Sequence, residues 1–380
     1  MDRLHDKQTE VKKRYRCFNM GKRVINFNPG PAALPLPALE KARDEFLDFA
    51  GTGMSVLEIS HRSKEYEKVH NEATELLREL LGVPTDYKIA WLQGGASTQF
   101  YQVPVNLVLP GKRMEYAITG AWSEKAVKEA ALYGEVKIVA TSADQKFSYI
   151  PAKVKFGAGA SYAHITSNET IHGVEWPYWP EVPSDVPLVC DMSSDFMGRA
   201  IDVKKFGVIY AGAQKNVGPA GVTVVIVRED LLTRAAKNIP TMSKWITHTT
   251  ENSLYNTPAT FAIYISKLVL DYDKQIGGLA AVEKTNREKA KLVYDAIDKS
   301  KGYYKGHAKP DSRSIMNITF RLASEELETK FADESKKAGL IGLKGHRSVG
   351  GLRASLYNAV TLEGTRKLVE FMKEFQEKNP

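Results

Sequence analysis

The sequence predicts an α/β protein: a large domain with a mainly parallel, mixed sheet covered by helices, followed by a smaller α/β C-terminal domain. From residue 86 onward, short apolar runs alternate with amphipathic stretches, which is the pattern of strand and helix units in a layered domain. Several of the apolar runs are hydrophobic on both faces, as strands of a covered parallel sheet are. The chain has 380 residues, enough to bury a large core without disulfides.

The large domain is expected to contain a strand wherever a short apolar run lies between turn residues. We predict such strands at residues 89–93, 115–118, 136–140, 162–166, 188–191, 208–211 and 222–227. Helices are predicted at residues 97–109, 122–133 and 259–274.

The pair Gly277-Gly278 breaks the last of these helices, and the texture of the sequence changes after it. We therefore expect a flexible basic extension, a segment packing on the small domain, a large domain and a small domain, at residues 1–23, 24–35, 36–275 and 276–380. The small domain is predicted to contain strands at 317–322 and 352–357 and helices at 324–338 and 363–377. Clefts between domains are common ligand sites.

The charge distribution excludes several classes of protein. The formal net charge is +8, but the first 23 residues contain eight basic and three acidic side chains, which leaves only +3 for the remainder. This argues against nucleic-acid binding and allows one small anion pocket. No apolar run is long enough to span a membrane. The two cysteines, Cys17 and Cys190, lack neighbours at metal-ligand spacing, so we expect no metal and a reducing compartment, the cytoplasm.

Lys215 is the first candidate for chemistry. It lies in the small-residue segment GAQKNVGPAG, residues 212–221, between two predicted strands. Small neighbours allow a bulky group to approach the backbone, and partial burial lowers the pKa of a lysine so that its neutral amine can attack a carbonyl. The alternative is a solvated lysine in a turn.

Asp191 is the second candidate, because a predicted apolar strand delivers it to the edge where open α/β sheets bind ligands. A carboxylate there needs a cation, and the protonated ring nitrogen of pyridoxal phosphate would serve. The alternative is a turn or helix-cap aspartate, a role that suits Asp195 better.

Three further segments follow predicted strands. Gly94 and Gly95 lead into Ala96 and Ser97 at a helix start, where backbone amides can receive a phosphate, although such turns are also ordinary connections. Trp122 offers a flat face for a heteroaromatic ring, or simply packs in the core. Thr170 can donate its hydroxyl to a phenolate oxygen, or cap a turn.

Two His-Arg pairs form a second group, His61-Arg62 and His346-Arg347, with Arg353 close behind in sequence. Guanidinium groups bind carboxylates and phosphates through paired hydrogen bonds. The set fits a small substrate with several anionic groups. The alternative for each pair is a solvated surface position.

Taken together, the chain resembles the phosphoserine aminotransferases, class V members of the fold-type I pyridoxal-phosphate enzymes. The resemblance runs from about residue 24 to the C-terminus. It is carried by FNPGPAALP at 27–35, SHRS at 60–63, GAQKNVGPAG at 212–221, NTP at 256–258 and GHRSVGG at 345–351.

The resemblance implies that pyridoxal 5'-phosphate is the cofactor and that Lys215 binds it covalently. Asp191 would pair with the ring nitrogen, Trp122 would stack on the ring and Thr170 would bond the phenolic oxygen. The cofactor phosphate would be held by Ala96, Ser97 and Gln214, joined by Asn256 and Thr257 of a second subunit.

The substrate side follows from the same resemblance. His346 and Arg347, with His61 and Arg62 of the neighbouring subunit, would bind a substrate phosphate, and Arg353 would bind the α-carboxylate. Sites shared in this way imply a homodimer.

The implied reaction is the reversible transamination of 3-phosphohydroxypyruvate with L-glutamate, giving O-phospho-L-serine and 2-oxoglutarate in serine biosynthesis. A phosphorylated threonine-like compound of vitamin B6 synthesis is a second possible substrate. Alternatives are another class V enzyme, such as an alanine-glyoxylate aminotransferase or a cysteine desulfurase, and a catalytically silent dimer that binds a phosphorylated ligand.

Overall fold

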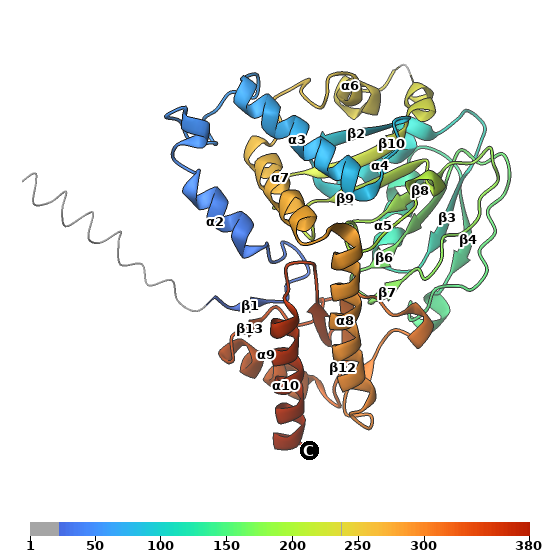
Figure 1. Ribbon diagram of the computed structural model, residues 1–380. Coiled ribbons are helices and arrows are strands. Elements are labelled where there is room, and N and C mark those ends of the chain that lie inside the picture. The colour runs from blue at the N-terminus through green and yellow to red at the C-terminus, as the bar shows by residue number, and fades with distance from the viewer. Residues whose placement is uncertain (1–22, 237) are drawn as a thin grey trace, which may run out of the picture.

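The computed structural model describes residues 23–236 and 238–380 (Figure 1). Within them, a seven-stranded sheet forms the centre of the large domain, in the order β2-β10-β9-β8-β5-β3-β4. Its strands are β2 (Tyr87–Leu92), β3 (Met114–Ile118), β4 (Val136–Thr141), β5 (Ala163–Thr166), β8 (Leu188–Asp191), β9 (Val208–Gly212) and β10 (Thr223–Arg228). The expected extension, apart from Arg23, lies outside the described residues.

The sheet is mainly parallel, which confirms the predicted fold class. Strand β10 runs antiparallel to both β2 and β9, while the pairs β9-β8, β8-β5, β5-β3 and β3-β4 are parallel. All strands except β10 therefore end at one edge of the sheet. Side chains at the ends of these strands can meet there.

Helices cover both faces of this sheet, as strands that are apolar on both sides require (Figure 1). Strand β10 illustrates the alternation: Val224 and Ile226 belong to the core with α3 and α7, and Val225 and Val227 to the core with α4 and α5. The helices of the large domain are α2 (Leu36–Asp44), α3 (Lys64–Leu81), α4 (Gly95–Leu107), α5 (Ala121–Ala130), α6 (Trp245–Thr250) and α7 (Thr260–Gln275).

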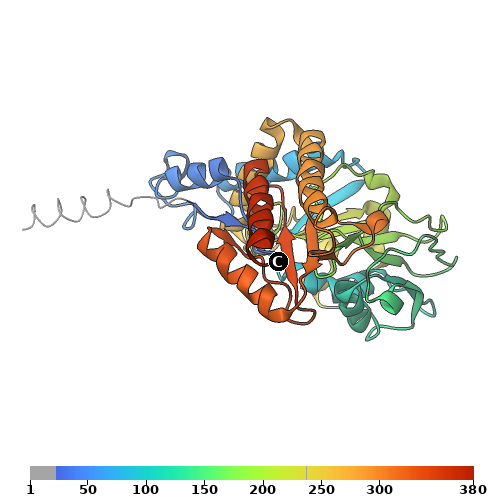
Figure 2. The ribbon, with the colours of Figure 1, turned by 90° about the horizontal axis from the view of Figure 1, so that it is seen from below.

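The C-terminal part of the chain forms a second, smaller α/β body. A three-stranded antiparallel sheet within the described residues has the order β11-β12-β14. Figure 2 shows α8 and α10 side by side next to it. Its elements are α8 (Gly278–Asp298), β11 (Lys305–Gly306), β12 (Asn317–Arg321), α9 (Glu325–Lys337), β13 (Leu340–Ile341), β14 (Leu352–Ser355) and α10 (Leu362–Lys378).

Two segments connect the bodies. Strand β1 (Ile25–Asn26) pairs in parallel with β13, and Phe27 lies in the core of the C-terminal body. Helix α8 starts at the second glycine of the pair and contributes Leu279 to the core of the large sheet and Val293 to the C-terminal core. A short hairpin, β6 (Asn168–Glu169) with β7 (Val174–Glu175), faces the C-terminal body, because Ile315 donates its amide to the Glu175 carboxylate.

The predicted elements are present with bounds that differ by three residues or fewer. The largest difference is the helix expected at 122–133, which ends at Ala130. There the amides of Leu132 and Tyr133 bond three residues back, to Glu129 and Ala130, which tightens the chain into a turn. In the described part of the chain, no helix has the length and apolar character that crossing a membrane would need.

Candidate active site

A cavity of about 280 Å³ lies at the carboxyl edge of the large sheet, where the C-terminal body meets it. It is formed by segments that follow the sheet strands, together with residues of the C-terminal body. Those of its lining residues that were expected at the site are Ala96, Ser97, Trp122, Thr170, Asp191, Gln214, Lys215, His346 and Arg353.

Lys215 lies in a tight turn after β9, in which the amides of Val217 and Gly218 both bond the Ala213 carbonyl. Its side chain is buried, and Nζ donates to Thr170 Oγ1 at 2.9 Å. Burial lowers the pKa of Lys215 to about 8, although the negative charge of Asp191 opposes the shift. At pH 7 roughly a tenth of this lysine is therefore a neutral nucleophile, far more than of an ordinary lysine.

Gly30 packs against this lysine. Its φ is 136°, and a Cβ there would lie 3.4 Å from Lys215 Cγ. A side chain at position 30 would be strained and would crowd the lysine.

Asp191 ends β8 and is buried. Ser193 donates its amide (2.9 Å) and its hydroxyl (2.6 Å) to Asp191 Oδ1. Burial raises the pKa of Asp191, while Ser193 and Lys215 oppose the rise. Both Ser193 bonds reach the same oxygen, so Oδ2 can accept from an N–H of a ligand.

The start of α4 provides free backbone amides. Gly94 has a φ of 97°, and a Cβ there would lie 2.1 Å from Thr98 Oγ1, so the sharp entry into the helix requires glycine. Ala96 and Ser97 follow in the first helical turn and line the cavity beside Gln214. A helix N-terminus of this kind binds a phosphate through its amides and its dipole.

Trp122 is held by a residue that the sequence analysis missed, Glu169. The Glu169 carboxylate accepts the amides of Trp122 at 3.0 Å and Ser123 at 2.9 Å, at the start of α5. Gly120 makes room, since a Cβ there would lie 2.4 Å from Glu169 Cδ. The Lys215 Nζ lies 5.8 Å from the centre of the Trp122 ring. The only sequence signal for Glu169 is its position next to Thr170.

The C-terminal body contributes two residues to the cavity. Arg353 on β14 is buried, and its Nη1 donates to the Thr170 carbonyl at 3.2 Å. Burial lowers its pKa. His346 lies in the loop before β14, where its Nδ1 is 2.7 Å from Ser348 Oγ. A carboxylate bound at Arg353 would thus lie beside the Lys215 partner Thr170.

Five expected residues do not line this cavity in the single chain. Arg347 lines a neighbouring groove and is exposed. Arg62, close to the start of α3, is also exposed. His61 comes directly before Arg62, and Asn256 and Thr257 lie exposed in the segment before α7.

The residues around the cavity fit pyridoxal 5'-phosphate. A buried amine, a carboxylate with an available oxygen, an indole and a helix N-terminus match its aldehyde, ring nitrogen, ring face and phosphate. Among the described residues, buried polar atoms without a hydrogen-bond partner include Thr166 Oγ1, Trp122 Nε1 and Arg353 Nε, all of them on residues that line the cavity. Buried polar atoms of this kind call for a polar ligand.

The family model for class-V aminotransferases matches residues 24–368. The chain belongs to this family. It is 54% identical to the phosphoserine aminotransferase of Lysinibacillus sphaericus, over 95% of this chain and all of that protein. The solved structure of phosphoserine aminotransferase from Bacillus circulans subsp. alkalophilus has a TM-score of 0.92 and 52% identity, covering 94% of this chain and 99% of that one.

A third similar protein is the phosphoserine aminotransferase of Trichomonas vaginalis, solved with pyridoxal phosphate bound. Its TM-score is 0.86 at 40% identity, over 92% of this chain and 100% of that chain. These similarities confirm the fold class and the family that the sequence motifs indicate.

Proposed function

We propose that the protein is a phosphoserine aminotransferase that uses pyridoxal 5'-phosphate to transfer the amino group of L-glutamate to 3-phosphohydroxypyruvate. The observation that carries this proposal is the similarity over nearly the whole chain to phosphoserine aminotransferases, 54% identical for one of them. The buried Lys215 and Asp191, which both line the cavity, support it.

When bound, the cofactor supplies an electron-withdrawing ring that stabilises negative charge at the substrate Cα. Lys215 would bind its aldehyde carbon covalently and, once displaced by the substrate amine, would move a proton from the substrate Cα through Nζ. The lowered pKa of Lys215 suits a group that both accepts and returns a proton near neutral pH. Thr170 Oγ1, at 2.9 Å, orients the amine.

Asp191 would hold the proton on the ring nitrogen, since an ionised carboxylate beside that atom favours its charged form. The two Ser193 bonds stabilise the carboxylate in its ionised state and fix its direction. Trp122 would stack on one face of the ring and exclude water from that face.

The substrate would be oriented by its anionic groups. Arg353 would bind the α-carboxylate that both substrates share, and His346 and Arg347 would bind the phosphate. In this proposal, His61, Arg62, Asn256 and Thr257 reach the cavity from a second copy of the chain, so the active unit is a homodimer.

The alternatives considered from the sequence have less support. Neither an alanine-glyoxylate aminotransferase nor a silent ligand-binding dimer is favoured by an observation. A cysteine desulfurase needs a cysteine in a loop at the site, but Cys190 is fully buried in β8 and packs in the core with α3 and α7.

An absorption experiment tests the proposal. Purified protein loaded with pyridoxal phosphate should show a visible band that L-glutamate bleaches and 3-phosphohydroxypyruvate restores. A visible band that glyoxylate, and not 3-phosphohydroxypyruvate, restores would favour the alanine-glyoxylate alternative. A protein that binds the phosphorylated substrate but never gains a band would be the silent dimer.

A further inference from the structure

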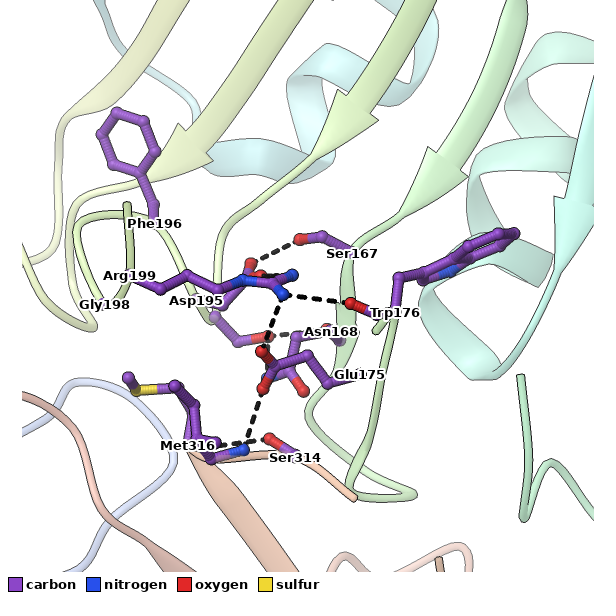
Figure 3. A network of polar contacts seen from close by, with 12 residues as sticks. Ser167, Asn168, Glu175, Trp176, Asp195, Phe196, Gly198, Arg199, Ser314 and Met316 are labelled. Atoms are coloured by element: carbon purple, nitrogen blue, oxygen red, sulfur yellow. Dashed lines mark hydrogen bonds and ion pairs between the residues drawn. The ribbon is translucent and has the colours of Figure 1, made fainter. Parts of the chain in front are cut away.

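A buried polar network follows Asp191 in the fold and has no part in the chemistry described so far (Figure 3). Its centre is Asp195, which the sequence suggested as a turn or cap residue. Asp195 does lie in a turn, but its carboxylate is buried in an ion pair with Arg199, four residues later. Asp195 is not part of the cavity lining.

Asp195 is connected to Asp191 through one side chain. The Ser167 hydroxyl donates to Asp195 Oδ1 and also lies 3.1 Å from the Asp191 carbonyl oxygen. The Ser167 amide donates to the same carbonyl at 2.9 Å. Asp195 therefore holds the Ser167 side chain, and the Ser167 main chain holds the Asp191 carbonyl.

Arg199 fixes Asp195 from the other side. Its Nη2 donates to Asp195 Oδ2 at 3.0 Å, and its Nη1 donates to the Trp176 carbonyl at 3.0 Å and lies 3.3 Å from Glu175 Oε1. The guanidinium also lies 4.6 Å from the centre of the Trp179 ring. The Arg199 side chain is 11% exposed, so these contacts are made almost without water.

The same network reaches the C-terminal body. Glu175 Oε2 accepts the amide of Ile315 at 2.8 Å, just before β12. Asn168 Nδ2 donates to Ser194 Oγ at 2.8 Å and to Asn317 Oδ1 at 2.8 Å, on β12 itself. One arginine thus ties the turn after Asp191 to the hairpin β6–β7 (Figure 3). That hairpin binds β12, and the partner strand of β12 is β14, which carries the cavity residue Arg353.

We infer that Arg199 is a positioning residue for the transamination: through Asp195 and Ser167 it holds Asp191 in the place where its carboxylate meets the cofactor nitrogen. The inference rests on the proposed role of Asp191. Residues 192–195 contain both Ser193, which donates two hydrogen bonds to Asp191, and Asp195 itself. A looser turn would therefore change the orientation of the Asp191 carboxylate in the cavity.

Charge is the physical reason why arginine is needed here. Asp195 and Glu175 are both buried, with 2% and 6% of their side chains exposed, and Arg199 is the cation paired with each. A buried carboxylate without a cation is strongly destabilising. Without Arg199, the turn that carries Asp195 would therefore rearrange to expose the carboxylate to water, or the carboxylate would take up a proton. A lysine keeps the charge but cannot reproduce the forked contacts.

The test compares three variants of the holoenzyme with a matched control. Arg199→Lys and Asp195→Asn alter the ion pair, and Ser167→Ala removes only the hydroxyl between Asp195 and Asp191. The control is Arg113→Lys, which alters another arginine paired with a buried carboxylate, Glu115 at 2.7 Å, where neither residue lines the cavity. The readouts are cofactor affinity of the apoprotein, the pH midpoint of the visible band and the thermal unfolding midpoint.

We expect each of the three variants to weaken cofactor binding by about tenfold, the order of one lost charge-assisted hydrogen bond, and to shift the pH midpoint of the band. Arg113→Lys should lower the unfolding midpoint and leave both cofactor readouts unchanged. If Arg199→Lys does not fold, Ser167→Ala still tests the inference, because the loss of a single oxygen atom should leave the fold intact.

Unchanged affinity and band in Ser167→Ala, or cofactor readouts in Arg199→Lys that match those of Arg113→Lys, would overturn the inference and leave a purely structural ion pair. The proposed function has its own check in the same series. If Asp191→Asn also leaves the band unchanged, or the unsubstituted protein takes up no pyridoxal phosphate, the cofactor assignment itself fails.

Discussion

The two halves of the site are built differently. In the half expected to bind the cofactor, one chain supplies Lys215, Asp191 and Thr170, all buried and hydrogen-bonded. In the half expected to read the substrate phosphate, Arg62 and Arg347 are exposed. The groups that carry the chemistry are therefore buried when one chain folds, whereas substrate selection depends on bringing exposed cations together.

The largest effect is expected at Lys215. Lys215→Ala should lower turnover by about 10³-fold or more, since a positioned acid–base group and the covalent attachment are both lost. Steady-state assays measure it, and borohydride trapping with peptide mapping should label position 215 in the unsubstituted protein. Lys125→Ala is the control, because Lys125 Nζ lies 4.2 Å from the centre of the same Trp122 ring yet is exposed. Label on another lysine would refute the assignment.

Asp191→Asn comes next. It keeps the shape and removes the charge beside the ring nitrogen, so we expect kcat to fall by about 10²-fold, comparable to loss of one preorganised electrostatic contact. The visible band should also move. Ser97→Ala serves as a control at the phosphate end, where the proposed contact is a backbone amide and the side chain is exposed. Equal losses in the two variants would argue against a special role for the carboxylate.

Mixed dimers test directly whether one active site is formed by two chains. Lys215→Ala chains lack the cofactor half and Arg62→Ala chains lack part of the phosphate half, so in a shared site one of the two sites of a mixed dimer is intact. Activity of the mixture should exceed the sum of the two separate preparations. A mixture that is merely additive would place Arg62 in the site of its own chain or in none.

A smaller effect separates the two half-reactions. Arg62→Ala and Arg347→Ala should weaken the reaction of the phosphorylated substrate by about 10- to 100-fold, because an unpaired anion costs about 1–3 kcal/mol, and should leave the glutamate half-reaction nearly unchanged. Single-turnover absorbance measures each half. Arg353→Lys is the contrast, since a carboxylate contact at Arg353 serves both substrates. Parallel losses in both halves for Arg62→Ala would contradict its phosphate role.

The smallest effect concerns pH. Burial lowers the pKa of Lys215 from its ordinary value of 10.5 to about 8, so the amine loses its proton as pH rises through 8. The rate at which apoprotein captures pyridoxal phosphate should therefore rise with pH and level off above that midpoint. Asp191→Asn should move the midpoint lower, because Asp191 favours the charged lysine. Stopped-flow absorbance measures both; a midpoint near the ordinary lysine value would mean an exposed lysine.

The sequence predicted the parts of the site that depend on local order. Asp191 ends one apolar strand and Lys215 follows another, and apolar strands are visible in a single sequence. It did not reveal Glu169, which binds amides 46 and 47 residues away, or the contact of Arg199 with the distant Glu175. Such contacts exist only after the sheet has assembled, and a buried carboxylate looks like a surface one in the sequence.

Local pattern also missed α3 and α8 as defined helices. Ser63 caps α3 by accepting the Tyr66 amide, a signal that was present in the sequence. For α8, the start after Gly277 was recognisable in the sequence. That the helix packs in two hydrophobic cores was not, because the packing of distant strands decides which core a residue joins.

The packing of α8 in two cores has a thermodynamic consequence. A continuous 21-residue helix with Leu279 in one core and Val293 in the other cannot fray in either region without exposing apolar surface of its neighbour. The two bodies of the chain should therefore melt as a single cooperative unit, with one calorimetric transition in place of two.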